Sequence, residues 1–484
     1  MTNVNKHNIE KLGKEMIEYC GGLPLAITVL GGLLASKQTQ DEWEDVLKHI
    51  KSYILKEDGL HVKRVLGLSY NELPFHLKPC FLYLGHFPED FEISAAEELI
   101  QMWMGEGFIP QIRLGVDCEG TMEYEGERYL RELMQRSMIQ VGEISRLGRI
   151  KTCRIHDVMR DFCISKAEQE NFLQITKKNI HSKEGSQEHI GKIRRLAITL
   201  ESNDNYLNEY PYLRSLLYFM PSKEFYFKKS KLLRVLNLNS YQRENLTKDI
   251  GCFIHLRFLS LKNSNINKVP SCLGNLRCLQ TLDLRCCYGP IVRVPNVFKE
   301  MGQLSHLYLP HLYRVSEKLE LGNLCYLRTL LNVGPQTIKM PISFRFNHLR
   351  ILGFNCQSYR PRLGMKTGTG EVPHVIQILS SHPHIYVLYV NYPIRKLPKT
   401  CQFSPNLAEL YSEYNCLEKD PMPTLEKLPN LKILHLLGSY MPFLEKDMVC
   451  SERGFPLLQY LFLSNLFSLE EWRVEKEPCL VSAI

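Results

Sequence analysis

The chain has 484 residues, of which 44% are hydrophobic and 23% are charged. It is therefore long enough for roughly two to four globular domains and too apolar to be intrinsically disordered. Its formal net charge of +8 arises from 60 basic and 52 acidic residues spread along the chain, so charge alone does not demand a nucleic-acid partner. The 16 cysteines include no Cys-x-x-Cys pair and no histidine at zinc spacing, which favours reduced thiols over a disulfide framework or a metal site.

The first 57 residues contain helical signals. Residues 23–35 form an apolar run that is too short to span a bilayer and is broken by Pro24 and two glycines, so a buried helix is expected there. Thr39 and Glu42 have the spacing of a capping box, which predicts that a helix begins at this point. No other segment is apolar enough to cross a membrane, and we expect a cytoplasmic protein.

Residues 58–172 have the element order of a winged-helix domain. Ser94 and Glu97 repeat the capping-box spacing before an amphipathic helix. Two short strands are expected around a turn that contains glycine. That amphipathic helix, the candidate for reading DNA, carries Glu97, Glu98 and Glu106 and no Lys or Arg up to residue 107, which disfavours contact with phosphates. The other helices are expected at 60–70, 77–87, 125–135 and 155–162, and the strands at 138–141 and 149–154.

From residue 190 to the end, the frame Leu-x-x-Leu-x-Leu returns every 20 to 27 residues. Such a period predicts a leucine-rich-repeat solenoid, in which each unit contributes one strand to a shared core and no unit folds alone. One interval of 36 residues contains a segment rich in glycine and threonine at 361–370, which we interpret as an inserted loop. The middle leucines are Leu196, Leu216, Leu236, Leu259, Leu282, Leu307, Leu330, Leu352, Leu388, Leu410, Leu434 and Leu461.

The frame also predicts which side chains line the concave face, because residues alternate across a strand. The position between the last two frame residues changes from polar to aromatic along the array. Aromatic side chains are enriched in protein interfaces, so the aromatic members are the candidate partner-binding residues. The alternative is that these rings pack on neighbouring repeats or on the end of the array. The candidates are Tyr308, Tyr389, Tyr411, His435 and Phe462.

Three motifs together resemble those of the plant intracellular disease-resistance receptors, which have a nucleotide-binding NB-ARC module, a winged-helix domain and leucine-rich repeats. The motifs occur in the family's order and resemble those of its coiled-coil, late-blight-resistance-like class. They are Gly-Leu-Pro-Leu-Ala at 22–26, the segment from Cys80 to Asp90, and Ile155-His156-Asp157.

The resemblance implies an α+β multidomain chain: a C-terminal helical remnant of the NB-ARC domain at 1–57, a winged-helix domain at 58–172 and a leucine-rich-repeat horseshoe at 190–484. It also implies that Pro24 would pack on the adenine of ADP or ATP and that His156 would reach its phosphates. No phosphate-loop motif Gly-x-x-x-x-Gly-Lys-Ser/Thr occurs in the sequence. We therefore expect no tight nucleotide binding by this chain, and the missing NB-ARC and coiled-coil regions would lie upstream. Pro24 could instead only start its helix, and His156 only cap its own.

The leading functional hypothesis is a non-catalytic fragment of an innate immune receptor. Its repeats would recognise a pathogen effector or a guarded host protein, and the winged helix would couple this to an incomplete ADP/ATP switch. The alternatives are a nucleotide-binding ATPase switch that retains ADP, and a generic repeat scaffold. Arg194, Arg195 and other basic residues at the start of the array are expected to face an acidic surface of the upstream nucleotide domain.

Overall fold

The computed structural model describes most of the chain and divides it into two compact units. The first unit is Met1–Asp204 with Glu209–Leu217, and the second is Asn205–Asn208 with Tyr218–Ile484. Among the described residues, no helical segment has the length and hydrophobicity of a membrane span. The proposed loop at 361–370 lies outside the described residues. The described residues are 3–54, 61–110, 121–176, 193–199, 210–219, 230–242, 244–286, 291–339, 346–355, 382–392, 396–415, 417–438 and 446–475.

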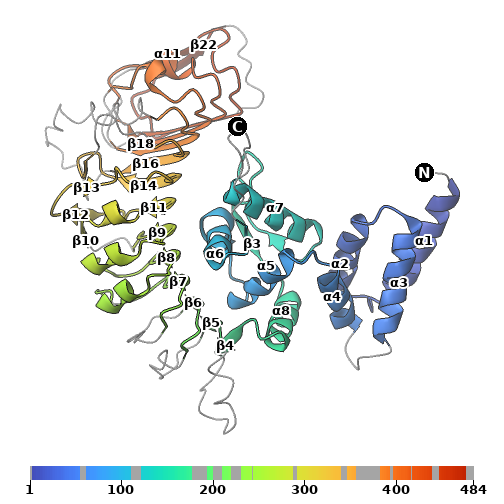
Figure 1. Cartoon of the computed structure of the whole chain (residues 1–484). Coiled ribbons are helices and arrows are strands. Elements are labelled where there is room, and N and C mark those ends of the chain that lie inside the picture. Colours follow the sequence, from blue (N-terminus) through green and yellow to red (C-terminus); the bar gives the residue numbers. More distant parts are fainter. Residues whose placement is uncertain are drawn as a thin grey trace. The chain divides into compact units, whose positions relative to one another are not determined.

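The first unit begins with four helices: α1 (Asn3–Glu18), α2 (Pro24–Ala35), α3 (Gln40–Ile54) and α4 (His61–Asn71) (Figure 1). The expected capping box is present at the start of α3. Glu42 Oε2 accepts a hydrogen bond from the Thr39 amide at 2.9 Å, and the Glu42 amide donates to Thr39 Oγ1 at 3.3 Å. The expected buried helix is α2, whose apolar face joins one core with α1, α3 and α4.

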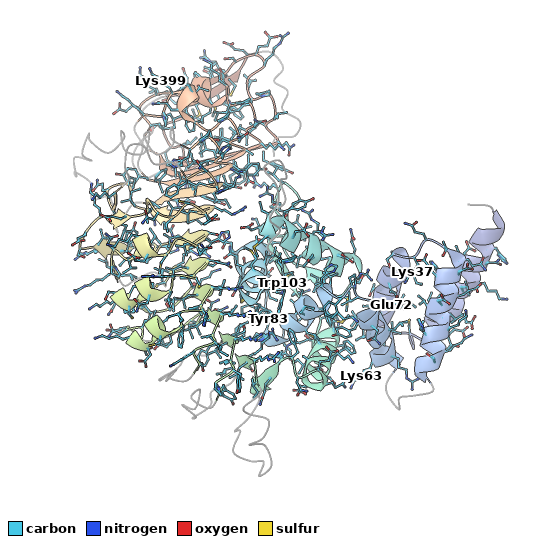
Figure 2. The ribbon with its side chains drawn as sticks, viewed as in Figure 1. Lys37, Lys63, Glu72, Tyr83, Trp103 and Lys399 are labelled. Atoms are coloured by element: carbon cyan, nitrogen blue, oxygen red, sulfur yellow. The ribbon has the colours of Figure 1, made fainter. Side chains whose placement is uncertain are left out.

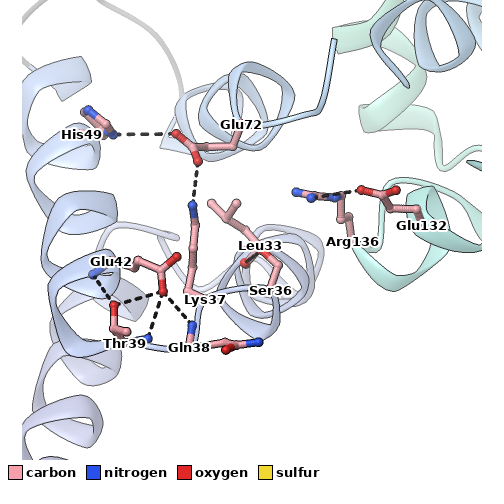
Figure 3. A network of polar contacts seen from close by, with 10 residues as sticks. All are labelled: Leu33, Ser36, Lys37, Gln38, Thr39, Glu42, His49, Glu72, Glu132 and Arg136. Atoms are coloured by element: carbon pink, nitrogen blue, oxygen red, sulfur yellow. Dashed lines mark hydrogen bonds and ion pairs between the residues drawn. The ribbon is translucent and has the colours of Figure 1, made fainter. Parts of the chain in front are cut away.

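Polar and close-packed contacts hold α2 against the elements that follow it. Lys37 Nζ, just after α2, lies 2.9 Å from Glu72 Oε2 at the end of α4 (Figure 3). Gly32 in α2 faces the end of the later helix α7 (Met122–Gln135). A Cβ atom at Gly32 would lie 2.6 Å from the backbone carbonyl carbon of Arg136, so only glycine permits this approach. The N-terminal helices are thus packed onto the winged-helix elements within one unit.

The winged-helix order expected from the sequence is confirmed. Its antiparallel sheet has the order β1-β3-β2, and β1 is a strand that the sequence reading missed. The predicted capping box at Ser94 is wrong: the Ser94 side chain makes no cap hydrogen bond, because the chain leaves β1 through a π-helical turn, η2. The elements are α5 (Leu77–Tyr83), η1 (Leu84–His86), β1 (Ile93–Ser94), η2 (Ala95–Leu99), α6 (Ile100–Glu106), α7 (Met122–Gln135), β2 (Gln140–Val141), β3 (Thr152–Arg154) and α8 (Asp157–Gln169).

The first unit ends in strands of the repeat type: β4 (Gln174–Thr176), β5 (Arg195–Ile198) and the start of β6 (Ser215–Tyr218). β4 precedes the first leucine frame and pairs in parallel with β5. Sequence inspection missed β4 because it carries no leucine frame. The Tyr83 hydroxyl lies 2.7 Å from the Ser215 hydroxyl, both buried, so a winged-helix side chain contacts a repeat strand within this unit. Figure 2 labels Tyr83 among the side chains of the first unit.

The second unit is a parallel β-solenoid, which confirms the predicted repeat architecture (Figure 1). Each middle leucine pairs with the next one, as in Leu236 with Leu259 and Leu434 with Leu461. The 36-residue interval does not break the sheet, since Leu352 pairs directly with Leu388. In sheet order the strands are β7 (Val235–Asn237), β8 (Phe258–Ser260), β9 (Thr281–Asp283), β11 (His306–Tyr308), β14 (Thr329–Val333), β16 (Ile351–Asn355), β17 (Val387–Asn391), β18 (Glu409–Asn415), β19 (Ile433–Gly438) and β21 (Tyr460–Ser464).

Short elements return the chain between these strands. They include three parallel two-stranded sheets, β10-β12, β13-β15 and β20-β22. The frame leucines fill the space between the two sides and are almost fully buried, except on the last strand, β21, where Leu461 is half-buried. The return elements are η5 (Lys248–Cys252), η6 (Ser271–Asn275), β10 (Val292–Val294), η7 (Phe298–Glu300), β12 (Tyr313–Val315), β13 (Leu319–Glu320), β15 (Ile338–Lys339), η8 (Thr400–Gln402), α11 (Met422–Leu425), β20 (Asp447–Cys450) and β22 (Glu471–Val474).

Candidate functional site

The structure aligns the concave-row residues of neighbouring repeats. Tyr389 pairs in register with Tyr411, Tyr411 with His435, and His435 with Phe462. A bulge between Leu330 and Val333 interrupts the row in the middle of the sheet. Whether the row binds a partner stays a prediction at this point.

Tyr308 differs from the other four candidates because it is buried, with 2% of its surface exposed. The Arg285 guanidinium lies 4.3 Å from the centre of its ring, and that guanidinium also pairs with Asp283 at 2.6 Å. Between Tyr308 and Tyr389 the row holds only Leu331 and Gly353, which carry no aromatic ring. Tyr308 is therefore separate from the later aromatic residues, and its ring is not open for contact in this structure.

The rings of the four remaining candidates form a continuous row, which we call the aromatic ladder: Tyr389, Tyr411, His435 and Phe462. The Tyr389 and Tyr411 rings are stacked, with centroids 4.9 Å apart and planes 15° from parallel. Tyr411 meets His435 edge-on at 6.0 Å, and His435 meets Phe462 edge-on at 5.0 Å. Such pairs favour fixed ring orientations, so the ladder presents a preorganised surface. The alternative that these rings pack on neighbouring repeats holds in part, because each ring contacts the next one.

The ladder remains accessible along its length. Tyr389, Tyr411 and His435 are half-buried, and Phe462 is 39% exposed. Large rings that are held in place and still partly exposed are the side chains that contribute most to protein–protein binding. The ladder is therefore suited to contact a protein surface.

Two carboxylates flank the ladder on strand β18. Glu409 and Glu413 lie two residues before and after Tyr411, so all three side chains leave the same face of the sheet. The Tyr411 hydroxyl donates a hydrogen bond to Glu409 Oε2 at 2.9 Å, which fixes the ring. Neither glutamate forms an ion pair with any other residue that the structure describes. Sequence reasoning missed both, although their two-residue spacing from Tyr411 was a usable signal.

Pro24 occupies the first turn of α2, where its missing N–H costs no hydrogen bond. Leu23 and Ile27 beside it are 43% and 36% exposed, and Pro24 itself is exposed. Gly21 and Gly22 have positive φ values of 58° and 74°, which set the turn before the helix. This end of α2 therefore presents an apolar surface of the kind on which a planar ring can pack.

His156 caps α8. Its Nδ1 accepts a hydrogen bond from the Val158 amide at 3.3 Å, so the neutral ring carries its proton on Nε2. That tautomer can donate a hydrogen bond to an anion beside the exposed start of the helix. The capping role expected as the alternative is thus present, and it leaves Nε2 available. Pro24 and His156 lie on different helices of the same unit.

The second and third sequence motifs are brought together by α8. Arg160 Nε donates to the Phe87 carbonyl at 2.6 Å, and Cys163 Sγ donates to the Phe81 carbonyl at 3.3 Å. These bonds tie the start of α8 to the segment from Cys80 to Asp90. That segment is therefore joined to the helix that His156 caps.

The expectation that Arg195 faces an external acidic surface is wrong. Its Nη2 atom lies 2.8 Å from Glu106 Oε2, and the Glu106 side chain is fully buried. No group of three or more His, Cys, Asp or Glu residues with metal-binding geometry occurs among the residues that the structure describes.

The sequence is similar to known protein families in both parts of the chain. Residues 87–163 match the family model described as the disease resistance protein winged helix domain, and residues 212–359 match the leucine-rich repeat region model.

Curated relatives are similar over nearly the whole chain. A probable disease resistance RPP8-like protein 2 of Arabidopsis thaliana is 38% identical, over 97% of this chain and 55% of that protein. The disease resistance protein RPP8 of the same plant is 36% identical, over 98% of this chain and 55% of its own length. The chain spans about half the length of these curated relatives.

Proposed function

Because the chain belongs with the plant disease-resistance proteins that carry a winged-helix domain and leucine-rich repeats, we propose that its later repeats bind a pathogen effector or a guarded host protein. The observation that carries this proposal is the aromatic ladder, Tyr389 to Phe462, with Glu409 and Glu413 on the same face. The contact is a binding event, not a reaction.

Several features support the ladder as the binding surface. The rings are already oriented by their neighbours, so little side-chain entropy is lost when a partner covers them. The strands beneath are held by the continuous leucine core of the solenoid. A rigid frame with a partly exposed aromatic row at its surface is the arrangement expected of an interface centre.

Affinity capture with the purified chain tests this proposal. Wild type and the double variant Tyr411→Ala/His435→Ala are incubated with extracts of infected and uninfected plant tissue, and bound proteins are identified by mass spectrometry. Tyr212→Ala, an exposed tyrosine outside the row, is the control. We expect a protein that wild type and the control retain and the double variant loses. Equal retention by all three would reject the ladder as the binding surface.

The same experiment separates a receptor from a generic scaffold. A receptor for an effector retains a pathogen protein from infected tissue only, whereas a receptor for a guarded host protein retains a host protein that the infection modifies. A generic scaffold would retain the same unmodified host proteins from both extracts.

We also propose that Pro24 and His156 contact a nucleotide only when further residues supply a phosphate cradle. The exposed apolar start of α2 fits an adenine ring, and His156 Nε2 fits a phosphate oxygen. Two contacts of this kind are too few to hold a charged nucleotide, because most of the affinity of phosphate sites comes from backbone N–H groups and a lysine. The bound nucleotide would favour one of two positions of the winged-helix domain over the other.

Isothermal titration with ADP tests this part. We expect no measurable binding to the chain alone, and binding when the phosphate-loop region of a relative is fused in front of it. Loss of that binding in the fused protein with His156→Ala, but not with the exposed His49→Ala, would support the role of His156. Tight ADP binding by the chain alone would favour the alternative of a self-sufficient nucleotide switch.

A further inference from the structure

Three successive repeats place a set of aromatic, histidine and arginine side chains at the point where the chain enters each strand. Each repeat contributes two residues, and we call the six together the strand-entry patch. The backbone stacks the three repeats directly. The Arg350 amide donates to the Arg328 carbonyl at 2.8 Å, and the Tyr386 amide donates to the Arg350 carbonyl at 2.7 Å. The patch comprises Tyr326 and Arg328 before β14, His348 and Arg350 before β16, and His384 and Tyr386 before β17.

The patch is open and partly ordered. Tyr326 is 52% exposed, and its ring stacks on His348 with centroids 6.3 Å apart and planes 14° from parallel. His348, Arg350 and His384 are exposed. The Nη1 atom of Arg350 donates to the His384 backbone carbonyl at 3.4 Å, which ties the guanidinium to the next repeat.

The two arginines give this patch its positive charge. Burial and the nearby groups Arg328, Arg350 and His384 lower the pKa of His348, and burial and Arg328 lower the pKa of Arg350. Within the described part of the chain, His348, Arg350 and His384 form no ion pair with a carboxylate. The two guanidinium groups repel each other, and an anion bound beside Arg350 would relieve that repulsion.

The patch ends on both sides along the strand-entry edge. The equivalent positions of the two preceding repeats are Gln280 and Ser305, and that of the following repeat is Ala408. Three strands span roughly 10 Å, whereas nucleic-acid binders that depend on charge make about 6–10 phosphate contacts along a longer track. The size of the patch thus favours a few carboxylates on a folded or extended polypeptide over a nucleic acid. Arginine and tyrosine are also among the residues most enriched in the hot spots of protein interfaces.

We propose that the strand-entry patch binds an acidic segment of a partner protein, with a carboxylate paired to Arg350 and the segment lying against the stacked rings of Tyr326 and His348. Forked guanidinium groups bind carboxylates through two parallel hydrogen bonds, so Arg350 supplies both charge and orientation. The strand-entry patch and the aromatic ladder comprise different residues, but they meet at one repeat: His384 and Tyr386 precede β17, and Tyr389 lies within it.

Fluorescence anisotropy with the whole purified chain tests the proposal. The probes are a labelled oligo-glutamate peptide, an oligo-lysine peptide of the same length and a single-stranded oligothymidylate of matched charge, at about 50 mM salt, where charge contacts are weakly screened. We expect the glutamate peptide to bind most tightly. Arg350→Glu should weaken it about tenfold, and Arg350→Gln with His348→Gln should weaken it less but measurably.

The matched control is Lys432→Glu. Lys432 occupies the same strand-entry position two repeats after Tyr386, stands alone between Ala408 and Gln459, and undergoes the same change of charge. It should leave binding unchanged within about twofold. Tyr411→Ala in the aromatic ladder should also leave the peptide affinity unchanged. An equal loss from Lys432→Glu, no preference for the glutamate peptide over the lysine peptide, or tighter binding of the oligothymidylate would each overturn the proposal.

Discussion

The guanidinium of Arg195, on the first leucine-frame strand, lies 2.8 Å from the carboxylate of Glu106 at the end of helix α6. The Arg195 guanidinium also lies 4.1 Å from the centre of the Phe172 ring and 5.1 Å from that of Phe108. Together with the bond between Tyr83 and Ser215, this pair makes the first repeat strands part of the winged-helix unit. A movement of the winged helix therefore carries these strands with it.

Removing one partner of the Arg195–Glu106 pair should destabilise the first unit strongly. Arg195→Met leaves a buried carboxylate and Glu106→Leu leaves a buried guanidinium, and each should cost about 3–5 kcal/mol. The double variant should recover most of the loss, because no charge is left unpaired. Urea unfolding followed by Trp103 fluorescence, with Trp43 and Trp472 changed to Phe, measures the effect, since Trp103 is buried on the same helix. A double variant as unstable as the worse single variant would contradict this account.

Gly32 and its neighbour Gly31 provide a matched pair of substitutions. Gly32→Ala places a Cβ atom 2.6 Å from the Arg136 backbone and should destabilise the contact between α2 and α7 by about 1–3 kcal/mol. Gly31→Ala meets nothing within 4 Å and should stabilise the helix by up to about 1 kcal/mol. Thermal unfolding of both variants checks the opposite signs. Equal shifts in the same direction would show that the helices are not in close contact here.

His86 predicts a specific loss of stability in acid. Burial, and then the charge of Arg195, lower the pKa of its imidazole to about 3, although Nδ1 lies 2.7 Å from the Tyr83 carbonyl. The unfolded chain has the ordinary value of about 6.5, so it binds the proton first as the pH falls. The stabilisation is therefore full above about pH 6.5 and is lost toward pH 3, by up to about 1.4 kcal/mol per pH unit.

Comparison of unfolding midpoints at pH 7 and pH 5 tests this prediction. Between pH 7 and pH 5, His86→Leu should lose less stability than wild type does, whatever the stability of the variant at pH 7. The exposed His49→Gln should behave like wild type. If His86→Leu lost as much stability between pH 7 and pH 5 as wild type does, the His86 imidazole would not be the group that titrates.

The sequence was sufficient to predict the repeat fold because its evidence is periodic. Each middle leucine fills the same place in the core, so a regular spacing fixes both the strand and its register. Local capping signals were less secure. Thr39 forms its capping box, whereas Ser94 does not, because β1 determines where the chain enters the following turn. A short strand such as β1, paired across 58 or more residues, carries too little local signal to be found.

The candidate binding side chains were predictable only where they follow the strand alternation. The register of Tyr389, Tyr411, His435 and Phe462 follows from the frame alone. The burial of Tyr308 does not follow from the frame. It depends on Arg285 and on side-chain packing, which strand alternation does not describe. Nor could the pairing of Arg195 with Glu106 be read from the sequence, since 89 residues separate them.

The central claim is that the aromatic ladder contacts the proposed partner, a pathogen effector or a guarded host protein. Site-specific photo-crosslinking in infected plant tissue tests this claim most directly. A photoreactive phenylalanine analogue replaces Tyr411 in one variant and the exposed Tyr212 in another. We predict a covalent adduct with one partner protein from position 411 and none from position 212. An adduct from position 212 alone, or equal adducts from both positions, would contradict the account.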